Sequence, residues 1–220
     1  MNWTRLVIVV MIAGVSICFA QTVGIRPGAK TVVWSPPPVY LGVSPRSTVP
    51  KEMVGTLQVA KTPIILEKTK LEDIRRQFGG TIGYRGDAAA AEAWLCLHGS
   101  ETDGDWILWL TSGEMHGLTN IGGFYWRRIG SNEVPDRRCS SLTHEEGEVI
   151  LPIPLTLGMT GEEVRQLLGQ PSAVWGDRLL YDHEHQRVIR KEPWTVYNEV
   201  IVTIRKNAVW AIEVSKLTSD

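Results

Sequence analysis

A helix-like segment occurs twice in this chain, ninety positions apart, and this repetition restricts the possible folds more than any other feature of the sequence. Residues 71–79 read LEDIRRQFG and residues 161–169 read GEEVRQLLG. Each copy has an acidic first turn, apolar residues at helical spacing and a glycine at its end, which is typical of a short amphipathic helix. Because repeated sequence units fold into repeated structural units, we expect the surrounding architecture to occur twice as well.

The ends of both helices are marked by residues that start and stop helices. Thr69 and Thr160 stand at the expected N-caps, with Glu72 and Glu163 three residues further on. This is the spacing of a capping box, in which threonine and glutamate satisfy free backbone N–H groups reciprocally. A glycine closes each segment, and Pro171 strengthens the stop of the second helix.

Extended runs rich in aromatic and β-branched residues follow each helix. After the first helix these runs are 91–98, 106–111 and 124–129, and after the second they are 179–181, 196–204 and 208–214. Lys206 and Asn207 form the expected hairpin turn between the last two runs. We therefore predict an α+β fold of two tandem units, each with one or more helices packed on one face of a small antiparallel sheet.

The N-terminal region begins with the pattern of a secretory signal peptide. Arg5, an apolar run at 6–15 and a small-x-small sequence ending at Ala20 predict cleavage after that alanine. The apolar run is shorter than the roughly 20 residues that span a membrane, so we expect an exported chain without a transmembrane segment, in the periplasm or secreted. Lipidation of Cys18 is the alternative, and the bulky Ile17 before it disfavours that processing.

The rest of the chain divides by composition. Prolines, glycines and serines without apolar periodicity predict an extended tether after the signal peptide. The predicted boundaries are a signal peptide at 1–20, a proline-rich tether at 21–54, a first helix-on-sheet unit with a disulfide at 55–147 and a second unit at 148–220.

Cysteine content and charge narrow the possible functions. Cys96 and Cys139 remain after signal removal, and an even pair in an exported chain predicts a disulfide. Its loop closure would stabilise the fold by about 4 kcal/mol, whereas a metal or redox pair would need a short C-x-x-C spacing that is absent. A formal net charge of −1 means that the chain lacks the excess of positive charge that is typical of proteins that bind nucleic acid.

The second unit also carries a recognisable sequence pattern. Residues 157–175 read LGMTGEEVRQLLGQPSAVW, and residues 200–214 read VIVTIRKNAVWAIEV. With its Gly-Met-Thr entry and Leu-Gly-x-Pro stop, residues 148–216 resemble the SmpA/OmlA type of small exported domain, whose layout the β-lactamase inhibitor protein shares in tandem. The resemblance implies helices on an antiparallel sheet, binding of other proteins and no enzymatic activity.

Catalytic and cofactor-binding motifs are missing from the sequence. It contains no G-x-S-x-G, H-E-x-x-H, P-loop or G-x-G-x-x-G pattern. On a strand, the side chains of His183 and His185 would point to the same face and could bind a metal ion. No third ligand stands at a suitable spacing in the sequence. We therefore predict a non-enzymatic protein without cofactor or metal. A metal-binding or enzymatic protein that uses the His183–His185 region remains the alternative.

Strand alternation predicts a protein-binding face on the first sheet. In the run 106–111 the even positions are expected to face the core, and the odd positions carry aromatic or apolar side chains on the opposite face. Trp94 in the preceding run is expected on that same face, and either Tyr125 or Trp126 in the next run would complete it. Exposed aromatic surface of this kind is typical of protein interfaces. The candidate binding residues are Trp94, Ile107, Trp109, Tyr125 and Trp126. The alternative is that these side chains are core, covered by the other unit or by the tether.

Together these patterns predict an exported, non-catalytic protein-binding module of the bacterial cell envelope. An accessory role in envelope assembly fits the resemblance, and an inhibitor of an exported enzyme is the alternative within the same class. The expected partner is another exported or outer-membrane protein.

Overall fold

The computed structural model describes residues 30–37, 54–101, 104–143, 147–189 and 191–219. The predicted signal peptide, Cys18 and most of the predicted tether lie outside these residues. None of the helices described in the structure is long and apolar enough to cross a membrane.

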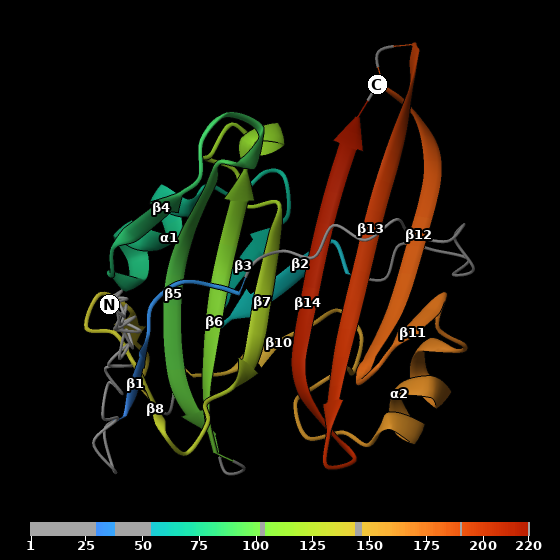
Figure 1. The fold of residues 1–220 in the computed structure, drawn as a ribbon. Helices are drawn as coiled ribbons and strands as arrows, with labels where there is room; N and C mark the ends of the chain where they lie inside the picture. The colour runs from blue at the N-terminus through green and yellow to red at the C-terminus, as the bar shows by residue number, and fades with distance from the viewer. Residues whose placement is uncertain (1–29, 38–53, 102–103, 144–146, 190, 220) are drawn as a thin grey trace, which may run out of the picture.

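The predicted α+β fold of two helix-on-sheet units is wrong. Of the described residues 54% lie in strands and 13% in helices, and a single nine-stranded sheet runs through both predicted units (Figure 1). Its antiparallel strand order is β11 (Ala173–Trp175), β12 (Arg178–Ile189), β13 (Glu192–Arg205), β14 (Ala208–Ser219), β7 (Gly123–Arg128), β6 (Gly104–Gly113), β5 (Glu92–Glu101) and β4 (Ile82–Arg85). The ninth strand, β9 (Ser140–Ser141), pairs parallel with β5.

The pairing of β14 with β7 joins the two halves of the sheet. Ala211–Ser215 lie antiparallel to Gly123–Arg127, so the last strand of the second half adds to the last strand of the first. This contact removes the free edge that each half would otherwise expose. The order of a helix followed by four strands still occurs twice, as α1 (Leu71–Phe78) with β4–β7 and α2 (Gly161–Leu168) with β11–β14.

One face of the sheet packs against both helices and a second, small sheet. This three-stranded sheet contains β2 (Thr56–Val59), β3 (Thr62–Ile65) and β10 (Val149–Ile150). The main core joins residues such as Leu57 of β2, Ile74 of α1 and Val164 of α2 to the inward side chains of the large sheet. Two short 3₁₀ turns lie at Ala88–Ala90 and Glu114–His116.

The helix ends confirm one predicted cap and correct the other. Thr160 and Glu163 form the predicted capping box at the start of α2. At α1 the N-cap is Lys70 and has no side-chain cap, because the hydroxyl of Thr69 accepts a hydrogen bond from Ile65 N instead. Both helices end at the predicted glycines.

Candidate functional site

The second face of the large sheet, here called the outer face, carries a row of large side chains across the central strands. Cross-strand pairing places Cys96, Trp109, Tyr125 and Glu213 side by side on β5, β6, β7 and β14. The predicted alternation of β6 is confirmed, since Trp106, Leu108 and Leu110 belong to the main core while Ile107 and Trp109 belong to a second apolar cluster on the outer face.

The structure brings together four of the five candidate binding residues. Trp94, Ile107 and Trp109 lie in the outer-face cluster, and the partly buried Tyr125 packs against it. The ring centroids of Trp109 and Tyr125 are 5.8 Å apart. Trp126 points to the other side and is fully buried in the main core. Of these five side chains, only Tyr125 is partly exposed.

An N-terminal segment of residues 31–37, here called the strap, covers the aromatic residues of the outer face. Its strand β1 (Thr31–Val33) pairs parallel with β8 (Glu133–Pro135). Trp34 makes an edge-to-face contact with Trp94 at 5.8 Å between ring centroids, and its carbonyl accepts a 2.9 Å hydrogen bond from Trp109 Nε1. The side chains of Trp94 and Trp109 are therefore occupied by the chain's own N-terminal region.

Arg85 of β4 holds the far end of the strap. Its guanidinium donates hydrogen bonds to the carbonyl oxygens of Pro36 and Pro37, at 2.6 and 3.1 Å. The same guanidinium lies 5.6 Å from the ring centroid of Trp94.

The predicted disulfide between Cys96 and Cys139 is present. The two Cα atoms are 4.6 Å apart, and both residues are buried in the outer-face cluster. The bond ties β5 to the segment that leads into β9, directly beside Val33 of the strap, which packs against the same cluster. The disulfide thus fixes the part of the outer face on which the strap rests.

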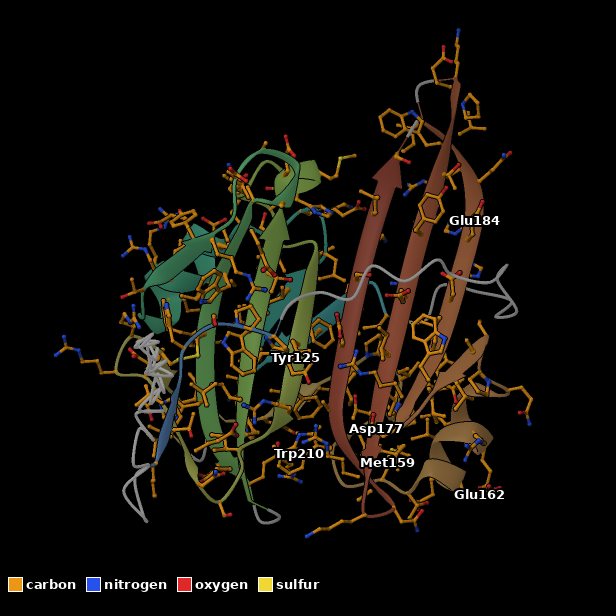
Figure 2. The ribbon with its side chains drawn as sticks, viewed as in Figure 1. Tyr125, Met159, Glu162, Asp177, Glu184 and Trp210 are labelled. Carbon is orange, nitrogen blue, oxygen red and sulfur yellow. A yellow bond between two sulfur atoms is a disulfide. The ribbon has the colours of Figure 1, made fainter. Side chains whose placement is uncertain are left out.

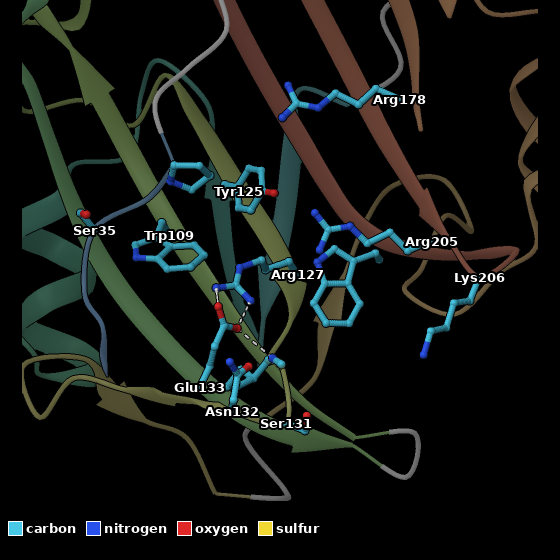
Figure 3. Close-up of a pocket in the computed structure, with 14 residues that line it drawn as sticks. Ser35, Trp109, Tyr125, Arg127, Ser131, Asn132, Glu133, Arg178, Arg205 and Lys206 are labelled. Carbon is cyan, nitrogen blue, oxygen red and sulfur yellow. Dashed lines mark hydrogen bonds and ion pairs between the residues drawn. The ribbon is translucent and has the colours of Figure 1, made fainter. Parts of the chain in front are cut away.

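Beside the strap the outer face forms a groove with a volume of about 780 Å³. Ser35 and Pro37 of the strap and the loop at 129–133 stand on one side, and the β13–β14 hairpin stands on the other (Figure 3). Of the fourteen described residues that line the groove, four are basic and one is acidic. The residues that dominate its chemistry are Tyr125, Arg127, Arg178, Arg205, Lys206 and Trp210.

The acidic residue of the groove is already neutralised. Arg127 donates to both carboxylate oxygens of Glu133 at 2.6 and 3.1 Å, and Gly130 N donates to the same carboxylate at 2.8 Å. Burial opposes ionisation of Glu133, but these hydrogen bonds outweigh it and lower the pKa of this carboxyl. Within the lining, no other carboxylate is therefore left to pair with Arg178, Arg205 or Lys206.

Trp210 reaches the groove because of a β-bulge in β14. Thr203 pairs with Ala211 and Ile204 pairs with Val209, so Trp210 is an extra residue between two ladder positions. A bulge re-aims side chains, and here Trp210 lines the groove rather than the core, with the guanidinium of Arg205 5.2 Å from its ring centroid. Trp210 on β14 and Tyr125 on β7 belong to the two strands that join the halves of the sheet (Figure 2).

Next to the groove the outer face carries two carboxyls with perturbed acidity. Burial raises the pKa of Glu213 on β14 to about 7, against the attraction of Arg178 and with further repulsion from Glu92. Burial, together with repulsion from Glu213 and Asp182, raises the pKa of Glu199 on β13 to about 7. These two carboxyls of the outer face therefore change charge close to neutral pH.

The histidine pair lies away from the groove. His183 and His185 face the same side of β12, and their ring centroids are 5.0 Å apart. Among the described residues, no three His, Cys, Asp or Glu side chains are placed to hold a metal ion together. The structure thus brings the two rings together as the sequence predicts, without a third ligand in the part of the chain it describes.

Sequence reasoning missed the groove, because its residues are distant in the sequence. Arg178, Arg205 and Trp210 come from the second half of the chain and Arg127 from the first, and only the β7–β14 pairing makes them neighbours. One local signal was present: the apolar positions Val209 and Ile212 are three residues apart, which breaks strand alternation and indicates a bulge. Comparison of the chain with protein-family models, curated proteins and solved structures gave no match.

Proposed function

We propose that this chain is an exported, non-catalytic protein-binding module of the bacterial cell envelope, and that the groove on its outer face is the surface that binds the partner. The partner is another exported or outer-membrane protein. The observation that carries the proposal is a concave site in which three cationic side chains without a carboxylate partner in the lining stand beside Trp210 and Tyr125.

The composition of the groove supports binding. Tryptophan, tyrosine and arginine are the residues that contribute most to protein interfaces. The described lining residues include no histidine or cysteine that could act as a general base or nucleophile. The site therefore offers recognition by charge and by flat aromatic surface.

Export is supported by two independent features of the chain. The first twenty residues have the pattern of a signal peptide. The buried Cys96–Cys139 disulfide is of a kind that persists in oxidising compartments such as the periplasm. An accessory of envelope assembly and an inhibitor of an exported enzyme would both use the groove in this way.

Crosslinking capture from an envelope extract tests the proposal. The chain from residue 21 to 220 is compared with an Arg178→Glu/Lys206→Glu variant and with a control, Lys61→Glu/Lys68→Glu, that changes the net charge equally at exposed positions around β3 on the other side of the sheet. We expect one partner, identified by mass spectrometry and confirmed by binding of the purified protein, to be lost only with the groove variant. Equal capture by all three chains would contradict the proposal.

A further inference from the structure

We propose that the groove takes an acidic, extended segment of the partner protein, with its carboxylates against Arg178, Arg205 and Lys206 and an apolar side chain against Trp210. This inference rests on the proposed function and adds the chemistry of the bound segment.

Charge is strongly segregated on this surface. The chain as a whole has a formal net charge of −1, yet the groove lining has four basic side chains and a single carboxylate. That carboxylate is held by Arg127. Outside the lining, Arg178 attracts Glu213, but burial raises the pKa of that carboxyl to about 7, so its negative charge is only partial near neutral pH. Such a local excess of positive charge repels basic segments and attracts acidic ones.

Asp177, which is not part of the lining, competes only weakly for Arg205. Asp177 Oδ2 lies 3.6 Å from Arg205 Nε, and both side chains are about half exposed. Exposed pairs of this kind contribute little, because water screens them and the side chains lose conformational freedom. A ligand carboxylate that enters the groove can therefore replace Asp177 at Arg205.

Aromatic rings hold two of the arginines in place. The guanidinium of Arg205 lies over Trp210 and that of Arg127 lies over Trp109, at 5.2 and 5.4 Å from the ring centroids. A guanidinium stacked on a ring still presents the N–H groups of its edge, which bind a carboxylate through two parallel hydrogen bonds. Stacking thus orients Arg205 for carboxylate recognition before any ligand arrives.

The dimensions of the groove suit a segment of polypeptide. A volume of about 780 Å³ is far larger than one inorganic anion requires and is in the range of sites that hold larger ligands. Ser35 and Pro37 of the strap contribute to one wall, and Ser131 and Asn132 add polar groups that can bind a peptide backbone (Figure 3). Carboxylates spaced along an extended chain would meet the cations in turn.

Fluorescence anisotropy with defined probes tests this inference. The acidic probe is a labelled short peptide in which glutamate alternates with leucine, and its matched probe has lysine in place of glutamate. A labelled oligogalacturonate tests an anionic polysaccharide. We expect the acidic peptide alone to bind, and binding to weaken at least tenfold in Arg178→Glu/Lys206→Glu but not in Lys61→Glu/Lys68→Glu. If the charge-reversed variant unfolds early, Arg178→Gln/Lys206→Gln replaces it.

The other outcomes overturn the inference. Equal loss in the control variant would show a non-specific effect of net charge, and preferential binding of the oligogalacturonate would assign the groove to a carbohydrate. If the acidic peptide fails to bind while capture of the partner still depends on Arg178 and Lys206, the acidic segment is refuted and the protein-binding function stands. If capture does not depend on these residues, the proposed function itself fails.

Discussion

Replacement of Glu213 by glutamine should stabilise the protein at alkaline pH. Glu213 is partly buried on β14, directly opposite Tyr125 on β7 and Ile201 on β13. Arg178 is the attractive charge that acts on it, while Glu92 repels it. Burial outweighs the attraction, so the folded protein favours the neutral form of this carboxyl. Glutamine has the same shape and stays neutral at every pH.

The pKa of Glu213 sets the size and sign of the effect. Its pKa is raised from 4.5 to about 7, which corresponds to about 3 kcal/mol at alkaline pH. Because the folded state binds the proton of Glu213 more tightly than the unfolded state, the contribution of this carboxyl to the free energy of unfolding is highest at acidic pH. It falls as the pH rises from about 4.5 to about 7 and is then constant. The glutamine variant should lack this fall.

Urea unfolding at pH 4.5 and pH 8 measures the difference. We expect Glu213→Gln to change the free energy of unfolding little at pH 4.5 and to raise it by about 3 kcal/mol at pH 8. Glu184→Gln, at an exposed position of β12, is the matched control and should show no such dependence on pH. A Glu213→Gln variant that is equally stable as the wild type at pH 8, or equally destabilised at both pH values, would refute the argument from burial.

Three further predictions concern the fold. Replacing Cys96 and Cys139 by alanine should lower the free energy of unfolding by about 4 kcal/mol on the loop-entropy estimate, and a loss below about 1 kcal/mol in chemical denaturation would contradict it. Thr160→Ala should cost about 1 kcal/mol, because it removes the capping box of α2, and helix-sensitive circular dichroism during thermal unfolding reports it. Gly122→Ala should destabilise by about 1–3 kcal/mol, since a β-carbon there would overlap the ring of His116; an unchanged melting temperature would show that the ring can move freely.

The two threonines that precede the helices show that the same local sequence pattern can form a helix cap in one place and not in another. Thr69 and Thr160 have the same spacing to a glutamate, yet only Thr160 forms the capping box. Thr69 follows β3 in a tight turn, and its hydroxyl accepts a hydrogen bond from Ile65 N. The Thr69 hydroxyl therefore bonds to the backbone of the preceding strand and does not cap α1.

For the candidate binding face, the sequence predicted which side chains share a face but not what covers them. Strand alternation correctly placed Trp94, Ile107 and Trp109 on one face of the sheet, because successive side chains of a strand point to opposite faces. Alternation cannot say what lies above a face. The structure places Trp34 over Trp94 and its carbonyl beside Trp109, so the apolar surface predicted for a partner is occupied by the strap.

By itself, the sequence determined the features that depend on neighbouring residues: two short helices that end at glycine, the alternation of the strands and the cysteine pair available for a disulfide. Only the tertiary structure decided that β14 pairs with β7, that the two halves share one sheet, and that Arg127 meets Arg178 and Trp210 around a groove. The reason is physical. Helix caps and side-chain alternation depend on contacts within a few residues, whereas the pairing of two strand edges depends on which backbone N–H and C=O groups remain free after each half has folded.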